Sequence, residues 1–265
     1  MAPDLTRRAW MTTIPAALAA ASTTTRAADG NAARPAAAPF RFGFNTFTIN
    51  GQKLPLVEEI DLVADAGYDG IEPWIREIDA YVQGGGSLAD LRKRIADRGL
   101  VVHDAIGFPE WVVDDDARRK KGVEEAKRCM ELVRQLGGTY LAAPAAGATD
   151  AIDPRRVAER YRVLLEIGAN IGVTPQLEIW GHSKTLGRLG QAMQAAIDAD
   201  HPSACVLADI FHLYKGGSGW EGLKLVNRNA LHVFHLNDYP ADPPRPESTD
   251  AHRVYPGDGV GMGKD

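Results

Sequence analysis

A helix that ends at a glycine and leads directly into a strand is encoded by Ala66-Gly67-Tyr68-Asp69-Gly70-Ile71. The same transition recurs in Gly137-Gly138-Thr139-Tyr140-Leu141. Glycine is favoured just past a helix end because it adopts a positive φ without steric cost. Helix and strand therefore alternate along the chain, which predicts a parallel sheet that is either doubly wound or closed as a barrel.

Short β-rich runs recur from Phe40 onward, and their starts lie about 25 to 40 residues apart, the length of a strand with its crossover helix. They cover residues 42–48, 70–72, 100–104, 140–143, 175–180, 204–209 and 231–236. Amphipathic helices, each followed by glycine, are predicted at 54–66, 88–98, 116–136 and 154–171.

Two observations favour a barrel over a doubly wound sheet. No strand leads into a GxGxxG turn, and Gly84-Gly85-Gly86 lacks that spacing, so a dinucleotide site is not expected. Polar residues also end many strands, as they do around the mouth of a barrel. They are Asn45, Glu72, His103, Glu178, Asp209 and His235. The prediction is an α/β fold, a TIM (β/α)8-type barrel over residues 39–265, C-terminally truncated with about seven βα units present.

The first 38 residues differ from the rest of the chain. Thr6-Arg7-Arg8-Ala9-Trp10-Met11 is a twin-arginine pattern, and a weakly apolar stretch and small residues around Arg26-Ala27-Ala28 follow it. This order predicts a twin-arginine signal and linker, and hence a periplasmic or extracellular protein. The alternative is a disordered, alanine-rich tail that contains an arginine pair by chance.

Composition excludes several classes of protein. The net charge of −5 argues against a nucleic-acid partner. No apolar run reaches the roughly 20 residues of a membrane helix, so no integral membrane segment is expected after signal removal. Cys129 and Cys205 lie inside predicted elements and do not form a disulfide framework.

Three strand ends carry unusual chemistry. Glu178 and Asp209 each interrupt an apolar strand, and His235 follows Val233 at the spacing of one strand face. A buried carboxylate is costly unless a cation or hydrogen-bond donors compensate it. Together these residues would supply oxygen and nitrogen ligands to Mn²⁺, Mg²⁺ or Co²⁺, with Zn²⁺ not excluded. Alternatively, Glu178 pairs with a buried Lys or Arg, Asp209 caps the next helix and His235 is a hydrogen-bonded core histidine.

From Phe40 to its end the chain resembles the xylose isomerase-like TIM barrels, the sugar phosphate isomerase/epimerase superfamily. The resemblance rests on a set of short motifs. They are Gly67-Tyr68-Asp69-Gly70-Ile71-Glu72, Leu177-Glu178, Asp209-Ile210-Phe211-His212, Phe234-His235-Leu236-Asn237-Asp238 and Arg253-Val254-Tyr255-Pro256-Gly257-Asp258-Gly259.

The resemblance implies roles for individual residues. Glu178, Asp209 and His235 match three of the four metal ligands of the family, and Glu178 also matches a carboxylate that transfers protons. His212 matches a catalytic histidine beside the substrate oxygens. Arg253 matches a substrate-binding arginine.

Further pocket residues follow from the resemblance with a weaker correspondence. Glu72 and His103 stand at strand ends that commonly line the pocket. Trp74 and Trp180 would form apolar walls against a sugar ring, although packing in the core explains either of them equally well. His182 lies near Lys184, which occupies the position of a second glutamate in the epimerases. The fourth metal ligand of the family, a glutamate on the eighth strand, has no counterpart before Asp265.

These features predict a metal-dependent sugar isomerase or epimerase that transfers a proton through an enediolate on a keto-sugar or polyol derivative. One alternative is a metal-dependent lyase or hydratase on a 3-keto-glycoside or related sugar. Another is a non-catalytic sugar binder or an inactive truncated barrel. The endonuclease branch of the superfamily is disfavoured because it needs more metal ligands. The expected partner is a small-molecule sugar, and a homo-oligomer is a further expectation from the resemblance.

Overall fold

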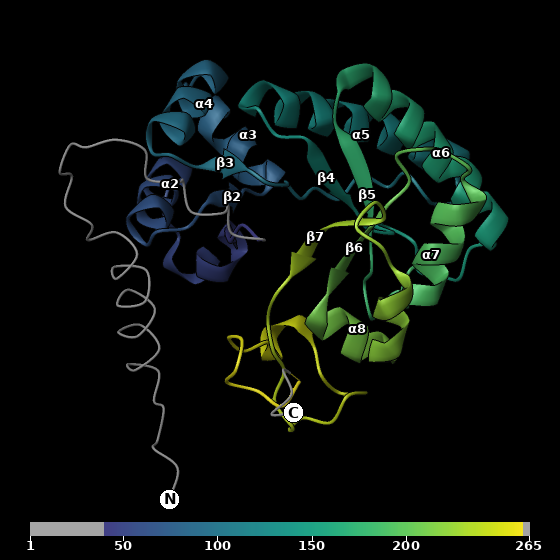
Figure 1. Cartoon of the computed structure of the whole chain (residues 1–265). Helices are drawn as coiled ribbons and strands as arrows, with labels where there is room; N and C mark the ends of the chain where they lie inside the picture. Colours follow the sequence, from purple (N-terminus) through teal and green to yellow (C-terminus); the bar gives the residue numbers. More distant parts are fainter. Residues whose placement is uncertain (1–39, 262–265) are drawn as a thin grey trace, which may run out of the picture.

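The computed structural model describes residues 40–261, so the predicted signal segment lies outside the described residues. Strands and helices alternate within it, and Figure 1 shows the helices packed around the outside of the strands. The strands are β1 (Gly43–Asn45), β2 (Gly70–Glu72), β3 (Val101–Val102), β4 (Tyr140–Ala143), β5 (Thr174–Glu178), β6 (Val206–Asp209) and β7 (Leu231–His235). The α-helices are α2 (Leu56–Asp65), α3 (Ile75–Gln83), α4 (Leu88–Asp97), α5 (Asp116–Leu136), α6 (Pro154–Ile171), α7 (Leu189–Asp198) and α8 (Ile210–Gly216). Short 3₁₀ helices are η1 (Thr46–Gln52), η2 (Trp220–Leu225) and η3 (Asp250–His252).

All neighbouring strands pair in parallel, in the orders β1-β2-β3 and β4-β5-β6-β7. Ile106 joins the two groups, because it bridges to Trp74 on one side and to Ala142 on the other. The described part of the chain thus forms one succession of seven parallel strands. Within it, β1 and β7 each pair on one side only, and no described strand closes the ring between them.

The predicted elements agree with the structure where the ending signals are strongest. Helices α5 and α6 have the predicted bounds, because Asp115 and Asp153 cap their first turns and Gly137 and Gly172 end them, each at φ 87°. Strands β2 and β4 also have the predicted bounds, whereas most of the others are shorter than predicted. Helices α3 and α7 were not predicted, since their first turns are capped from within by the side chains of Glu77 and Gln191.

Alternation along the strands separates two apolar layers. Ile71, Leu141 and Leu177 belong to the large core between the strands and the helices. Their neighbours therefore face the inner space that the strands surround, where Ala142 and Leu207 form a second, smaller apolar cluster. The polar strand ends face the same inner space, so the fold leaves charged groups inside a mostly apolar shell.

Residues 40–261 contain both cysteines of the chain and no helix suited to cross a membrane. Cys129 and Cys205 are buried, free thiols, which agrees with the prediction that they form no disulfide framework. None of the described helices combines the length and the apolar character that a membrane crossing requires.

Candidate active site

The inner space holds a group of four ionisable side chains, each at the C-terminal end of a parallel strand. Glu72 ends β2, Glu178 ends β5, Asp209 ends β6 and His235 ends β7. Parallel strands direct these ends to the same edge of the sheet. We call the four residues the carboxylate–imidazole cluster. Its carboxylates are almost fully buried, with 5% or less of each residue exposed.

Residue Asp209 faces His235 because of an irregularity in the sheet. The register between β6 and β7 shifts between Val206 and Ala208, and this shift makes Asp209 the direct neighbour of His235. A regular ladder starting from the pair Val206 and Leu231 would instead place Asp209 opposite Phe234. The shift therefore assembles this half of the cluster.

The His235 imidazole joins the two sides of the cluster. Its Nε2 atom lies 2.9 Å from Oε2 of Glu72, and its Nδ1 atom lies 3.8 Å from Oδ2 of Asp209. Burial by itself lowers the pKa of His235, but the carboxylates of Glu72, Glu178 and Asp209 outweigh it and raise this pKa to about 10. The ring therefore carries a positive charge among three carboxylates at neutral pH. The expectation of a hydrogen-bonded core histidine describes this contact correctly.

Residue Glu178 has no cation of its own. Its Oε2 atom is buried and has no hydrogen-bond partner among the described residues, and no described Lys or Arg pairs with it. The alternative of a structural ion pair is therefore wrong for the described chain. Burial raises the pKa of Glu178 to about 7; the nearby His235 opposes this rise, while Glu72 and Asp209 add to it. A carboxyl group with a pKa near neutrality can both accept and release a proton.

Two different functions share the carboxylate of Asp209. Its Oδ1 atom accepts the backbone N–H of His212 at 2.9 Å and so caps α8, as one interpretation of the sequence expected. Its Oδ2 atom accepts Nδ2 of Asn237 at 2.7 Å and lies 3.4 Å from Nη1 of Arg253. Burial tends to raise the pKa of Asp209, but Arg253, His212 and His235 together lower it. Asp209 thus caps α8 with one oxygen and contacts Asn237 and Arg253 with the other.

A second polar group adjoins the cluster at Arg253. Its Nη2 atom lies 2.8 Å from Nε2 of His212 and donates to Oδ1 of Asp250 at 2.6 Å. Burial lowers the pKa of His212 to about 4; Asp209 and Asp250 act against this, whereas Arg253 and His182 add to it. Because the guanidinium can only donate, Nε2 accepts and the proton of the neutral ring is assigned to Nδ1. This Nδ1 atom is buried without a partner in residues 40–261, so it is a donor available to a ligand.

Aromatic side chains form a row beside these polar groups. Phe47 stacks on Trp74 with 4.4 Å between ring centroids, and Phe108 lies 5.0 Å from Trp74 and 5.5 Å from Trp180. The row continues to His182, 5.1 Å from Trp180. Trp74 also packs on the inner apolar cluster, so the core interpretation holds for it. Phe47 and Phe108, each 43% exposed, were not among the predicted site residues, although Phe47 lies two residues after β1 and Phe108 six residues after β3.

Two of the residues considered in the sequence lie apart from the cluster. His103 packs over the first residues of β1 and β2, where a Cβ atom on Gly43 or Gly70 would come within 2.5 Å of its ring. No hydrogen bond among the described residues joins it to Glu72 or to the rest of the cluster. The Nζ atom of Lys184 donates to Oδ1 of Asp150 at 3.0 Å on the surface.

Residue Asp104 and its neighbour Gln176 were not predicted as site residues. Asp104 is fully buried, and its Oδ2 atom accepts Nε2 of Gln176 at 3.1 Å. Burial, and then the charge of Glu72, raise the pKa of Asp104 well above its usual range. The alternation of a strand through residues 100–104 predicts that His103 faces inward, but β3 ends at Val102 and the irregular backbone after it also turns Asp104 inward.

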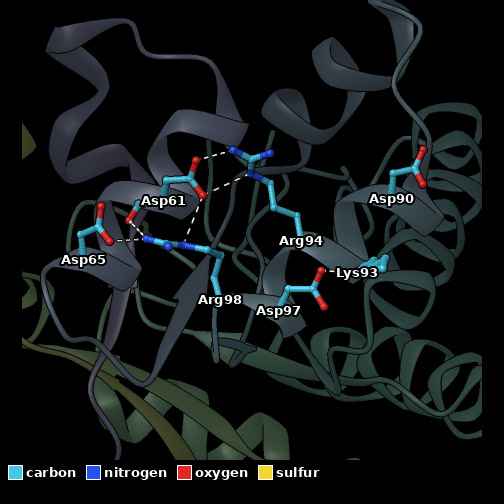
Figure 2. A pocket seen from close by; sticks show the side chains of 7 residues that line it. All are labelled: Asp61, Asp65, Asp90, Lys93, Arg94, Asp97 and Arg98. Carbon is cyan, nitrogen blue, oxygen red and sulfur yellow. Dashed lines mark hydrogen bonds and ion pairs between the residues drawn. The ribbon is translucent and has the colours of Figure 1, made fainter.

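A cavity of about 520 Å³ lies away from the carboxylate–imidazole cluster. It lies between α2 and α4, and Figure 2 shows the charged side chains that line it. These are Asp61, Asp65, Asp90, Lys93, Arg94, Asp97 and Arg98. Arg94 pairs with Asp61, and Arg98 pairs with Asp61 and Asp65, so this exposed network connects the two helices. None of the predicted site residues lines it.

The chemistry of the cluster fits a divalent cation, although His235 is already in contact with Glu72 and Asp209. Among residues 40–261, no three His, Cys, Asp or Glu side chains are arranged as a ready metal-binding group. Oε2 of Glu178 and Oε1 of Glu72 are nevertheless buried acceptors without partners in that range. Hard oxygens and one imidazole are suitable ligands for such an ion. Binding would require His235 to release its proton and its contact with Glu72.

The chain belongs to the xylose isomerase-like TIM barrel family, whose sequence model matches residues 60–264. One curated relative is an inosose isomerase of Bacillus velezensis, 28% identical over 77% of this chain and 75% of the relative. Another is a 3-dehydro-D-guloside 4-epimerase of Escherichia coli, 22% identical over 77% of this chain and 78% of the relative. A 3-dehydroshikimate dehydratase of Pseudomonas putida is 25% identical over 59% of this chain, but the match spans only 24% of that protein. These relatives are enzymes, which confirms the prediction of an enzyme.

Solved structures agree with the family assignment. The IolI protein, whose crystal structure contains a zinc atom, superposes with a TM-score of 0.77 at 24% identity, over 83% of this chain and 81% of that one. A probable 3-dehydroshikimate dehydratase, AsbF from Bacillus anthracis, superposes with a TM-score of 0.72 at 15% identity, over 84% of this chain and 85% of that one. The predicted TIM-barrel class of the fold is confirmed.

Proposed function

We propose that the chain is a divalent-metal-dependent isomerase or epimerase that acts on a keto-sugar or polyol derivative through an enediolate. The observation that carries the proposal is Glu178, whose buried Oε2 atom has no hydrogen-bond partner among the described residues and whose pKa is raised to about 7 beside His235 and Asp209. An acid–base group with a pKa near 7 is suited to move a proton to and from carbon at neutral pH. The inosose isomerase and guloside epimerase relatives support this reaction class.

The proposed metal ligands are Glu178, Asp209 and His235. A bound divalent ion would polarise the substrate carbonyl and stabilise negative charge on its oxygen, which makes the neighbouring C–H bond more acidic. Mn²⁺, Mg²⁺ and Co²⁺ suit the oxygen-rich donor set. Zn²⁺ is included because the IolI structure contains it.

The residues of the chain itself have distinct roles in the proposal. The Glu178 carboxylate removes the proton from the carbon beside the carbonyl. Nδ1–H of His212 and the guanidinium of Arg253 hold the substrate oxygens. If Glu178 is the only base, it returns the proton on the same face to the former carbonyl carbon. The hydroxyl proton passes between the two oxygens, so the carbonyl changes position, which is an isomerisation. If Glu72 returns a proton to the opposite face, the product is an epimer.

The test is solvent exchange of carbon-bound hydrogen. The metal-loaded full-length chain is incubated in deuterated water with an inosose and with 3-keto-glucosides, and deuterium on carbon is measured by NMR. We expect exchange that falls about 10²- to 10⁴-fold in Glu178→Gln. Glu58→Gln is the control, because Glu58 is an exposed acid on α2. No exchange with any keto-sugar would refute the proposal.

A second candidate is elimination of water from a related keto compound, and the dehydratase relatives favour it. The same enolate can expel a hydroxyl group from the next carbon instead of accepting a proton. In the exchange experiment, a dehydrated product that accumulates faster than any isomer would select this reaction.

A further inference from the structure

The carboxylate of Asp238 lies at the centre of a loop that the proposed mechanism does not explain. Asp238 is fully buried three residues after β7. Its Oδ1 atom accepts the backbone N–H groups of Tyr239 and Gly261, each at 2.8 Å. Its Oδ2 atom accepts those of Gly257 at 3.2 Å and Gly259 at 3.1 Å. One carboxylate therefore satisfies four backbone donors, three of which belong to a segment about twenty residues further along the chain.

The glycines of this segment are required for that contact. A Cβ atom on Gly259 would lie 2.5 Å from Oδ1 of Asp238 and 2.3 Å from the backbone oxygen of Tyr239. A Cβ atom on Gly261 would lie 2.2 Å from the ring of Tyr239. Gly257 has φ 89°, which other residues rarely adopt. Each glycine thus allows the segment to approach Asp238 or to turn around it.

The same aspartate fixes the backbone next to Arg253. Asp238 and Val254 form an antiparallel bridge in which each backbone N–H donates to the carbonyl of the other at 3.0 Å. Arg253 immediately precedes Val254, and its guanidinium lies 3.4 Å from Asp209 and 2.8 Å from His212. The backbone of Asp238 holds the start of the segment, and its side chain holds the end.

We propose that Asp238 is a positioning residue, whose carboxylate holds residues 254–261 and thereby keeps the Arg253 guanidinium beside Asp209 and His212. The inference rests on the proposed function for the role of Arg253 in substrate binding. It assigns the aspartate of the Phe234–Asp238 motif and the glycines of the Arg253–Gly259 motif to one task. That task is to orient a substrate-binding arginine supplied by a loop rather than by a strand.

The first experiment measures the contact between Asp238 and residues 254–261 by hydrogen exchange, and it requires no enzymatic activity. Asp238→Asn replaces one acceptor oxygen by a donor, so we expect the amide protons of Gly259 or Gly261 to exchange with solvent at least about tenfold faster. The buried Nε–H of Arg253 is expected to lose its protection at the same time. Asp258→Asn is the matched control, because Asp258 is an exposed acid of the same segment. Unchanged protection of the glycines and of Arg253 in Asp238→Asn would overturn the inference.

The second experiment separates positioning from general stability. With an inosose as substrate, Asp238→Asn is expected to lower kcat/KM about tenfold, chiefly through KM, and to have no further effect when Arg253 is already alanine. An equal loss in the Arg253→Ala background would show a merely structural role and overturn the inference. If Asp238→Asn does not fold, Gly261→Ala displaces the segment with the carboxylate intact and is expected to give the same pattern. If no variant turns over any keto-sugar, the proposed function fails, while the exchange of Gly259 and Arg253 still decides the inference.

Discussion

The Nε2 atom of His235 lies 2.9 Å from Oε2 of Glu72, and this contact joins β7 to β2 across the inner space. These strands are far apart in the order of the sheet, since β2 pairs with β1 and β3 whereas β7 pairs with β6. The contact therefore connects β7, at one end of the strand succession, with β2, the second strand from the other end, through side chains. It also makes His235 the residue on which both the electrostatics of the cluster and the proposed metal site depend.

Metal binding is expected to stabilise the protein only while His235 is present. At a free metal concentration about a hundredfold above Kd, binding to the native state contributes about 2.7 kcal/mol, which is measured as a rise in Tm. His235→Ala should abolish the rise. His232→Ala is the control, because His232 lies on the same strand, is exposed and stacks on Tyr140. An undiminished rise in His235→Ala would place the metal elsewhere.

Removal of the Asn237 side chain should weaken metal binding without removing a proposed ligand. Asn237 donates to Oδ2 of Asp209 at 2.7 Å and accepts the backbone N–H of Phe211 at 2.8 Å, so it orients that carboxylate. Loss of such an outer partner costs about 10- to 100-fold in metal affinity. Titration calorimetry of Asn237→Ala measures this loss, with the exposed Asn229→Ala as control. Equal affinities in the two variants would contradict the orienting role.

The pH dependence of stability should contain a contribution from Glu59. Burial, and then the charge of Glu77, raise the pKa of Glu59 to about 7, and Arg76 partly offsets them. The native state thus holds this proton more tightly than the unfolded chain, whose pKa is about 4.5. The resulting stability is complete below pH 4.5 and is lost as the pH rises to about 7.

Substitution of Glu59 by glutamine removes the loss of folding stability that the ionisation of Glu59 causes as the pH rises. Urea unfolding should therefore show that Glu59→Gln is more stable than the original chain at pH 8, with a smaller advantage at pH 4.5. Glu58→Gln, at the exposed neighbouring position, should show no such trend. A constant difference between Glu59→Gln and the original chain at both pH values would contradict the raised pKa.

Phe108 is expected to affect substrate binding more than the chemical step. It is 43% exposed and lies between Trp74 and Trp180 in the aromatic row. Aromatic contacts of this kind contribute about 0.5–1.5 kcal/mol, so Phe108→Ala should raise KM about two- to tenfold and leave kcat nearly unchanged. Phe40→Ala, at a more exposed position outside the row, is the control. A fall in kcat alone would contradict a role in binding.

Export is proposed from residues outside the described range. Replacement of Arg7 and Arg8 by lysine should keep the precursor inside a bacterial host, because the twin-arginine route recognises the arginine pair. Cell fractionation and immunoblotting measure the distribution of the protein. Arg26→Lys leaves the pair intact and should export normally. Equal export of the double-lysine variant would contradict the proposed route.

The sequence was informative about the fold because local signals dominate it. Glycine stops and aspartate caps determine α5 and α6 within a few residues, and their physical causes are local. Helix α3 was missed because its cap comes from Glu77 inside the helix rather than from a preceding Ser, Thr, Asp or Asn.

The contacts of the site were less accessible, because they depend on tertiary geometry. Alternation cannot reveal the register shift that makes Asp209 the neighbour of His235. Nor can it show that β3 ends early and leaves Asp104 buried beside Gln176. Asn237 and Asp238 stood in a quoted motif, but their roles require knowledge of which distant backbone groups they meet.

The double use of Asp209 limits how this position can change during evolution. Replacement of Asp209 by alanine removes the carboxylate from the cluster and the cap from α8 together. A homologue with this change would therefore lose helix stability as well as the proposed activity. Asparagine or serine can still accept the N–H of His212 while giving up the charge. A homologue that keeps the barrel but has lost the proposed activity is therefore expected to carry Asn or Ser at position 209. That residue would identify inactive homologues from their sequences.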